Sequence, residues 1–244
     1  MSFNLPTETI ELPSKGLLYP EGHPLSNGTI EIKYMTAKEE DILTNQNYIS
    51  NGTVLDKLLK SLIVTKFNYE ELLIGDKNAI MIASRILGYG AEYKFTYNGK
   101  EEVADLSKID NKPFDESLIT KGINEFSFKL PTSNNEITFK FLTHGDESKI
   151  NQELEGLKKL GKEGSPELTT RLKYIVTSIN GDRTTKLIRE FIDEAFLARD
   201  ARSFREYISK VQPDVDLTFF PESSTKSITL PIGISFFWPD VDLG

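Results

Sequence analysis

The feature that most constrains the fold is a similarity between the two parts of the chain. Residues 31–36 (EIKYMT) and 138–143 (TFKFLT) both read polar, apolar, lysine, aromatic, apolar, threonine, and an acidic stretch follows each of them. Upstream, residues 10–14 (IELPS) parallel residues 128–132 (FKLPT). Such a repeat indicates that the chain folds as two related units.

The parallel continues downstream in the same order. The matching pairs are residues 59–64 and 172–177, residues 75–80 and 199–204, and residues 92–95 and 216–219. The last two pairs share an offset of 124 residues, whereas the earlier offsets of 118, 107 and 113 place insertions in loops. Chance similarity between two α+β stretches is the alternative, but six matches in one order favour an internal duplication.

Local signals predict the elements of each unit as two strands, two or three helices and two further strands. Thr36 and Glu39 have the spacing of a capping box, and Asp76 and Asp200 are predicted to cap equivalent helices. Asn98-Gly99 predicts a tight hairpin. The predicted fold is therefore α+β, with two duplicated halves, residues 1–124 and 125–244, each holding a small, mainly antiparallel sheet.

Composition excludes several classes of function. The chain has 29 Lys and Arg against 37 Asp and Glu, a net charge of −8, which disfavours binding to nucleic acid or to an anionic membrane. It has no cysteine and only two histidines, so a disulfide framework, a thiol nucleophile and a three-histidine metal site are excluded. No apolar run is long enough to span a membrane, and the first residues lack a signal-peptide pattern.

No motif for catalysis is present. The sequence lacks a phosphate-binding loop, a zinc-protease helix and a nucleophile elbow, so we predict no catalytic, cofactor-binding or metal-binding residues and no cofactor. His144, between a predicted strand and a predicted helix, is interpreted as a turn or cap residue. The acids of residues 38–41 are interpreted as first-turn residues that complement a helix dipole.

The end of the chain is rich in aromatic residues. Phe236, Phe237 and Trp238 follow a stretch whose alternation predicts a strand over Ile228–Ile232. Because neighbours on a strand point to opposite sides, three adjacent aromatic residues cannot all face inward. The segment either packs on its own sheet or contacts a partner, and we take Phe236, Phe237 and Trp238 as the candidate partner-binding residues.

Four blocks carry a resemblance to a known family. Residues 12–16 (LPSKG), 34–44 (YMTAKEEDILT), 73–79 (LIGDKNA) and 236–239 (FFWP) resemble the baseplate hub subunit or hub assembly proteins of T-even-like contractile-tailed bacteriophages. The resemblance runs over nearly the whole chain. It implies a non-enzymatic structural or assembly role through contacts with other phage baseplate and tail proteins. It implies no contact with nucleic acid, membrane or a small-molecule substrate.

The resemblance also implies a location, the host bacterial cytoplasm during assembly and, if the protein stays, the baseplate of the virion tail. One departure concerns zinc. Similar sequences carry paired cysteines in two strand-turn regions, which here read as residues 97–100 and 221–224 without cysteine. We therefore expect no zinc.

Two other functions remain as alternatives. A small cytoplasmic enzyme of the hydrolase class could use carboxylates such as Asp76 and Asp200, which hold equivalent positions, although both fit a capping role better. A nucleic-acid-binding regulator could use the Arg-rich helices, which the net charge disfavours.

Overall fold

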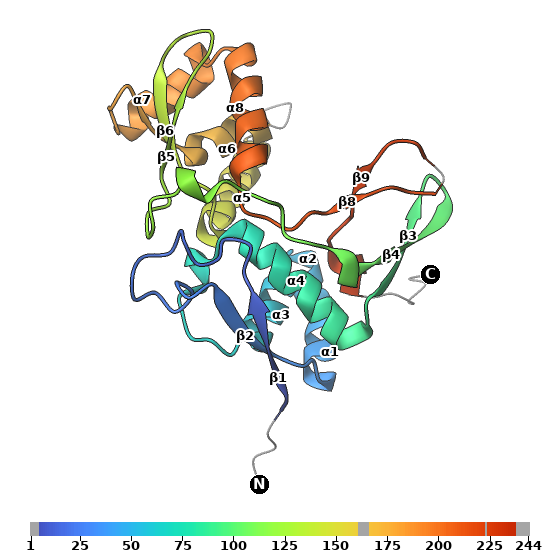
Figure 1. Ribbon diagram of the computed structural model, residues 1–244. Helices are drawn as coiled ribbons and strands as arrows, with labels where there is room; N and C mark the ends of the chain where they lie inside the picture. The colour runs from blue at the N-terminus through green and yellow to red at the C-terminus, as the bar shows by residue number, and fades with distance from the viewer. Residues whose placement is uncertain (1–4, 161–165, 223, 238–244) are drawn as a thin grey trace.

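The computed structural model describes residues 5–160, 166–222 and 224–237 (Figure 1). Within these residues the chain forms eight α-helices and four antiparallel sheets of two or three strands. The predicted mixed α+β class is confirmed. Each half holds two small sheets. One strand pair precedes the helices of the half, and another pair follows them.

The first half begins with a strand pair and continues into helices. Its elements are β1 (Thr7–Glu11), β2 (Thr29–Lys33), α1 (Ala37–Leu43), α2 (Gln46–Ser50), α3 (Val54–Leu62), η1 (Tyr69–Glu71), α4 (Ile74–Tyr89), β3 (Glu92–Tyr97) and β4 (Lys100–Asp105). Gly90 ends α4 with a φ of 83°. Asn98 and Gly99 both have positive φ in the predicted β3–β4 hairpin.

The second half follows the short helices η2 (Leu106–Lys108) and η3 (Glu116–Leu118). Its elements are β5 (Phe126–Lys129), β6 (Glu136–Phe139), α5 (His144–Lys159), α6 (Glu167–Ile175), β7 (Val176–Ile179), α7 (Thr185–Glu190), the π-helical turn η4 (Phe191–Ala195), α8 (Ala198–Val211), β8 (Thr218–Phe219), β9 (Ile228–Thr229) and the 3₁₀ helix η5 (Ile234–Phe237).

The first strand pair of each half has the same register. Ile10 pairs with Ile30 in the β1–β2 sheet, and the residues that the sequence match makes equivalent, Phe128 and Ile137, pair in the β5–β6 sheet. The isolated bridge between Ile32 and Ile63 recurs as the pairing of Phe139 with Val176. The register of the first strand pair therefore agrees between the halves, whereas the elements that follow it differ. The first half has α1, α2, α3 and η1 before α4, and the second has α5, α6, β7, α7 and η4 before α8.

The first helix of each half begins with the same polar group. A capping threonine, an acid three residues later and a lysine three residues earlier form this group: Lys33, Thr36 and Glu39 in the first half, and Lys140, Thr143 and Asp146 in the second. Burial opposes ionisation of Glu39, but hydrogen bonds from Lys33, Thr36 and Ser61 outweigh it and lower its pKa to about 2.

Asp76 and Asp200 lie at the third position of α4 and α8, so the prediction that they are N-caps is wrong. Leu73 and Leu197 occupy the N-cap positions, and neither makes a side-chain cap. Both aspartates are buried and instead bind the turn after the first strand of their half. Asp76 accepts a hydrogen bond from the backbone N–H of Ser14, and Asp200 accepts one from the equivalent N–H of Thr132.

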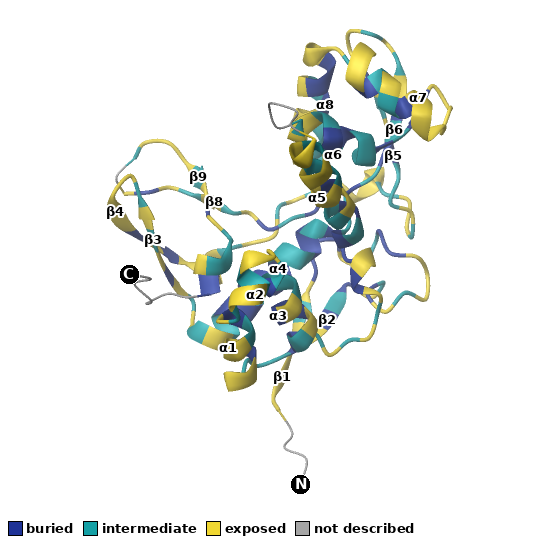
Figure 2. Ribbon diagram, turned by 180° about the vertical axis from the view of Figure 1, so that it is seen from behind, coloured by how far each residue is buried: buried dark blue, intermediate teal, exposed yellow. Residues whose placement is uncertain are grey.

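The chain end crosses to the first half, which changes the interpretation of its aromatic residues. Phe236 and Phe237 are fully buried, and the ring centroids of Phe236 and Tyr93 lie 4.8 Å apart in an edge-on contact. Figure 2 shows buried residues along α4, on which this segment packs. Arg85, in α4, donates a hydrogen bond of 2.8 Å to the carbonyl of Phe236. The proposal of Phe236 and Phe237 as exposed partner anchors is thus contradicted, and Trp238 lies outside the described residues.

The physical reason is the local backbone. Only Ile228–Thr229 is a strand, β9, and residues 234–237 form η5, a 3₁₀ helix, in which neighbouring side chains do not alternate across a plane. Both phenylalanines can therefore face the same core. The division between residues 1–124 and 125–244 stays a prediction, and η5 packs on α4 across it.

Candidate functional site

The two halves meet along their helix entries. Leu73, which precedes α4, forms an antiparallel bridge with Thr143, which precedes α5. The N–H of Ile74 donates to the carbonyl of Leu142 at 3.1 Å, and the N–H of His144 donates to that of Leu72 at 2.8 Å. Extended backbone before each helix leaves these groups free to pair, so the start of α5 is held against the start of α4.

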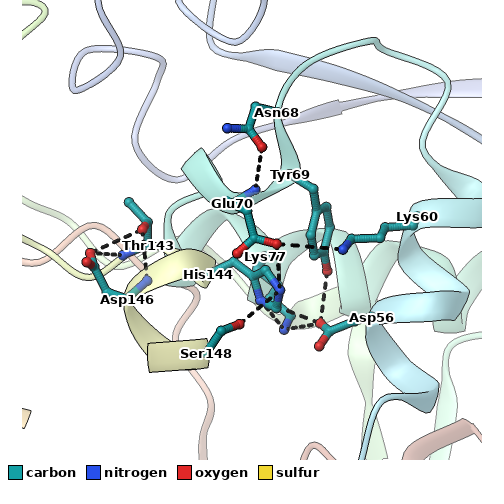
Figure 3. Close-up of polar contacts among 10 residues, drawn as sticks. All are labelled: Asp56, Lys60, Asn68, Tyr69, Glu70, Lys77, Thr143, His144, Asp146 and Ser148. Atoms are coloured by element: carbon teal, nitrogen blue, oxygen red, sulfur yellow. Dashed lines mark hydrogen bonds and ion pairs between the residues drawn. The ribbon is translucent and has the colours of Figure 1, made fainter. Parts of the chain in front are cut away.

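A cluster of polar side chains lies over this backbone contact (Figure 3). His144 contributes from the second half, and its ring contacts that of Tyr69 at 4.5 Å between centroids. Asp56, from α3, accepts hydrogen bonds from Lys77 Nζ at 2.6 Å and from the Tyr69 hydroxyl at 3.2 Å. Residues distant in sequence thereby form one network across the junction.

The electrostatics of the cluster favour a neutral imidazole. Burial lowers the pKa of His144, whose side chain is 7% exposed, and the charges of Lys77 and Lys60 act in the same direction. Asp56 and Glu70 oppose the shift without cancelling it. For Tyr69, burial and then the charge of Asp56 raise the pKa, so the phenol remains a donor.

Ser148, His144 and Asp56 occur in the order of a serine-hydrolase triad. Ser148 Oγ lies 3.5 Å from His144 Nε2, and His144 Nδ1 lies 3.6 Å from Asp56 Oδ1. However, Lys77 Nζ is closer to Asp56 and lies 3.4 Å from Nδ1. A lysine ammonium only donates, so Nδ1 accepts and the proton lies on Nε2, where it cannot take one from Ser148. The geometry suits a structural network.

Gly145 brings the two halves into close contact. A Cβ atom there would lie 3.0 Å from the carbonyl oxygen of Glu70, closer than most real Cβ contacts. Beside it, Asp146 accepts hydrogen bonds from the N–H and hydroxyl of Thr143, both at 3.1 Å, and holds the start of α5. These residues line one side of a cleft of ≈560 Å³, and Tyr19 and His23 line the other.

The carboxylates of the enzyme alternative are not brought together. Asp76 accepts hydrogen bonds from Ser14 and Tyr19, and Asp200 from Thr132 and Ser133, so within the described part of the chain they share no partner. Burial raises the pKa of Asp76. At Asp200 burial acts in the same direction, but hydrogen bonds from Thr132 and Ser133 outweigh it and lower the pKa.

Sequence reasoning placed His144 at a turn before a helix, and the structure makes it the first residue of α5. Its role in the junction was missed, together with Asp56 and Lys77. No local pattern identifies them, because their partners are distant in sequence and only the packing of the halves joins them.

Comparison with models of protein families, with curated proteins and with solved structures finds no match to this chain. The resemblance to phage baseplate proteins therefore rests on the sequence blocks alone. Among residues 5–160, 166–222 and 224–237, no group of three His, Asp or Glu side chains is placed to hold a metal ion. No helix in those ranges is long and apolar enough to cross a membrane.

Proposed function

We propose that this chain is a non-enzymatic structural or assembly protein at the hub of a contractile bacteriophage tail baseplate. It acts through contacts with other baseplate and tail proteins, in the host bacterial cytoplasm during assembly. The observation that carries the proposal is the structural role of the residues in the resembling blocks. Residues 34–44 hold the capping box of α1, and residues 73–79 hold Asp76 and Leu73, which bridges to Thr143.

The same blocks bear on the enzyme alternative. Asp76 has three hydrogen-bond donors around it, the N–H and hydroxyl of Ser14 and the hydroxyl of Tyr19, within 2.9 Å. A catalytic carboxylate must reach a substrate proton or carbon, whereas this one is fully buried. These contacts favour a framework role for the residue and so support the non-enzymatic proposal.

The proposal extends to the origin of the two halves as an internal duplication. Its support is the shared strand register, the shared polar group before the first helix and the equivalent contacts of Asp76 and Asp200. Independent strands would have no reason to pair the residues that the sequence match makes equivalent.

Affinity purification from infected bacteria tests the function. The tagged chain is expressed in cells infected with a T-even-like phage, and co-purified proteins are identified by mass spectrometry, with uninfected cells as the control. We expect baseplate and tail proteins in the infected sample only. Recovery of host metabolic proteins alone, together with turnover in a substrate screen, would contradict the proposal. Purified virions probed in parallel show whether the protein stays in the tail.

A further inference from the structure

One of the contacts between the halves, the one at their helix entries, is head to tail. The first half contributes residues 72–74, which enter α4, and the second half contributes residues 142–144, which enter α5. Under the correspondence between the halves, residues 196–198 are equivalent to 72–74, and residues 35–37 are equivalent to 142–144. Each half therefore uses a different one of its two surfaces, and within the described residues the other surface of each half makes no equivalent backbone contact.

Exposure agrees with this assignment. Leu73 is 5% exposed at the junction, whereas its equivalent Leu197 is 46% exposed. Likewise His144 is buried, whereas its equivalent Ala37 is exposed. Leu73 and His144, which contact the other half, are thus buried, whereas the equivalent residues Leu197 and Ala37 are exposed.

The charges on the two open surfaces are complementary. Gly145 lies against Glu70 at the junction. Lys38 is the equivalent of Gly145, because each lies two residues after the capping threonine of its half. Glu194 is the equivalent of Glu70, because each lies three residues before the leucine of its half. The same contact would therefore place Lys38 against Glu194. Both side chains are exposed, and neither forms an ion pair with another described residue.

We propose that residues 35–37 of one molecule bind residues 196–198 of a second copy of this chain, which repeats the contact between the halves from molecule to molecule. Because the two surfaces differ, the contact is heterologous and produces a ring if the rotation closes and a filament if it does not. The proposal rests on the correspondence between the halves and is independent of a role in a phage tail.

Sedimentation velocity on the full chain tests this with two blocking variants. Leu197→Asp introduces a charge at the N-cap of α8, where aspartate is a favoured residue. Ala37→Asp introduces one at the first position of α1, where the helix dipole favours an acid. Leu187→Asp, at a position 38% exposed on α7 of the same half, is the matched control. Circular dichroism verifies the fold, and Arg199→Glu replaces Leu197→Asp if that variant unfolds.

The expected masses are multiples of the 27.6 kDa monomer. The mass of the sedimenting species should increase with protein concentration for wild type and for Leu187→Asp. Each blocking variant alone should stay monomeric. An equimolar mixture of the two blocking variants should give a dimer and nothing larger, because each retains the surface that the other lacks. A monomeric wild type, an associating blocking variant, a mixture that stays monomeric or a Leu187→Asp that loses association would each overturn the proposal.

Discussion

Asp76 and Asp200 occupy the same position in the two halves yet differ in acidity. Both are buried third residues of a helix that bind the turn after a strand. Asp200 accepts hydrogen bonds from two backbone N–H groups, at 2.7 and 3.0 Å, whereas Asp76 accepts one, together with two hydroxyls, and lies near the charge of Asp214. Local sequence sets where the carboxylate sits, and the surrounding packing sets its pKa.

The two halves differ in a second way, in what covers them. The chain end packs on α4 through η5. At the junction α5 covers Leu73, while Leu197 stays open. Equivalent positions should therefore respond unequally to the same substitution, and the following predictions test that inequality from the largest expected effect to the smallest.

Removal of the Phe236 ring should have the largest effect. Phe236→Ala is expected to lower the free energy of unfolding by about 3–5 kcal/mol, since it opens a cavity beside Tyr93 in a fully buried site. Phe220→Ala, at a position 70% exposed, is the control and should change it by less than about 0.5 kcal/mol. Urea unfolding measures both. Equal effects would show that the chain end is not part of the core.

The leucines before α4 and α8 give a matched pair. Leu73→Ala should lower the free energy of unfolding by an amount near the low end of about 2–5 kcal/mol, because the side chain is buried at the edge of the cleft. Leu197→Ala should cost within about 0.5 kcal/mol in dilute solution. Thermal unfolding of the two variants makes the comparison, and a cost at Leu197 as large as that at Leu73 would contradict it.

The junction cluster predicts a pH-dependent effect. His144→Phe keeps a ring against Tyr69 but leaves Lys77 without its imidazole neighbour, at a cost of about 1–3 kcal/mol at pH 8. The folded pKa of His144 lies below its ordinary 6.5, so its contribution is complete above 6.5 and is lost as the pH falls through the folded pKa. The wild-type advantage should therefore shrink below pH 6.5. An advantage that grows there would show a raised pKa.

The two aspartates predict opposite slopes and the smallest effects. A lowered pKa at Asp200 stabilises the fold above the unfolded value of 3.8, and the stability is lost as the pH falls through the folded pKa. A raised pKa at Asp76 gives stability that is present below 3.8 and is lost as the pH rises. As the pH rises from 3 to 7, the free energy of unfolding of Asp200→Asn should fall further below that of wild type. The corresponding deficit of Asp76→Asn should become smaller.

Local signals in the sequence predict the elements that depend on near neighbours. The capping box of Thr36 and Glu39 and the Asn98-Gly99 turn both occur as predicted. The prediction for the aromatic residues at the chain end was wrong, because alternation over a few residues does not distinguish a strand from a 3₁₀ helix when both neighbours are buried.

The junction cluster could not be predicted from sequence. Asp56, Lys77 and His144 lie in three different helices, and only the packing of the halves brings them together. His144 was read as a turn residue because its neighbours in sequence offer it no partner. The sequence pairs Asp76 with Asp200 as helix caps, and their role as acceptors for a distant turn was missed.

Superposition of the two halves in an experimental structure tests the central claim most directly. The account predicts that one rigid-body fit places the Cα atoms of β1, β2, α3 and α4 on those of β5, β6, α6 and α8. In that fit the Ser14–Asp76 and Thr132–Asp200 hydrogen bonds should coincide. Elements that require separate rotations to match, or an Asp200 whose carboxylate does not reach Thr132, would contradict the equivalence of the halves.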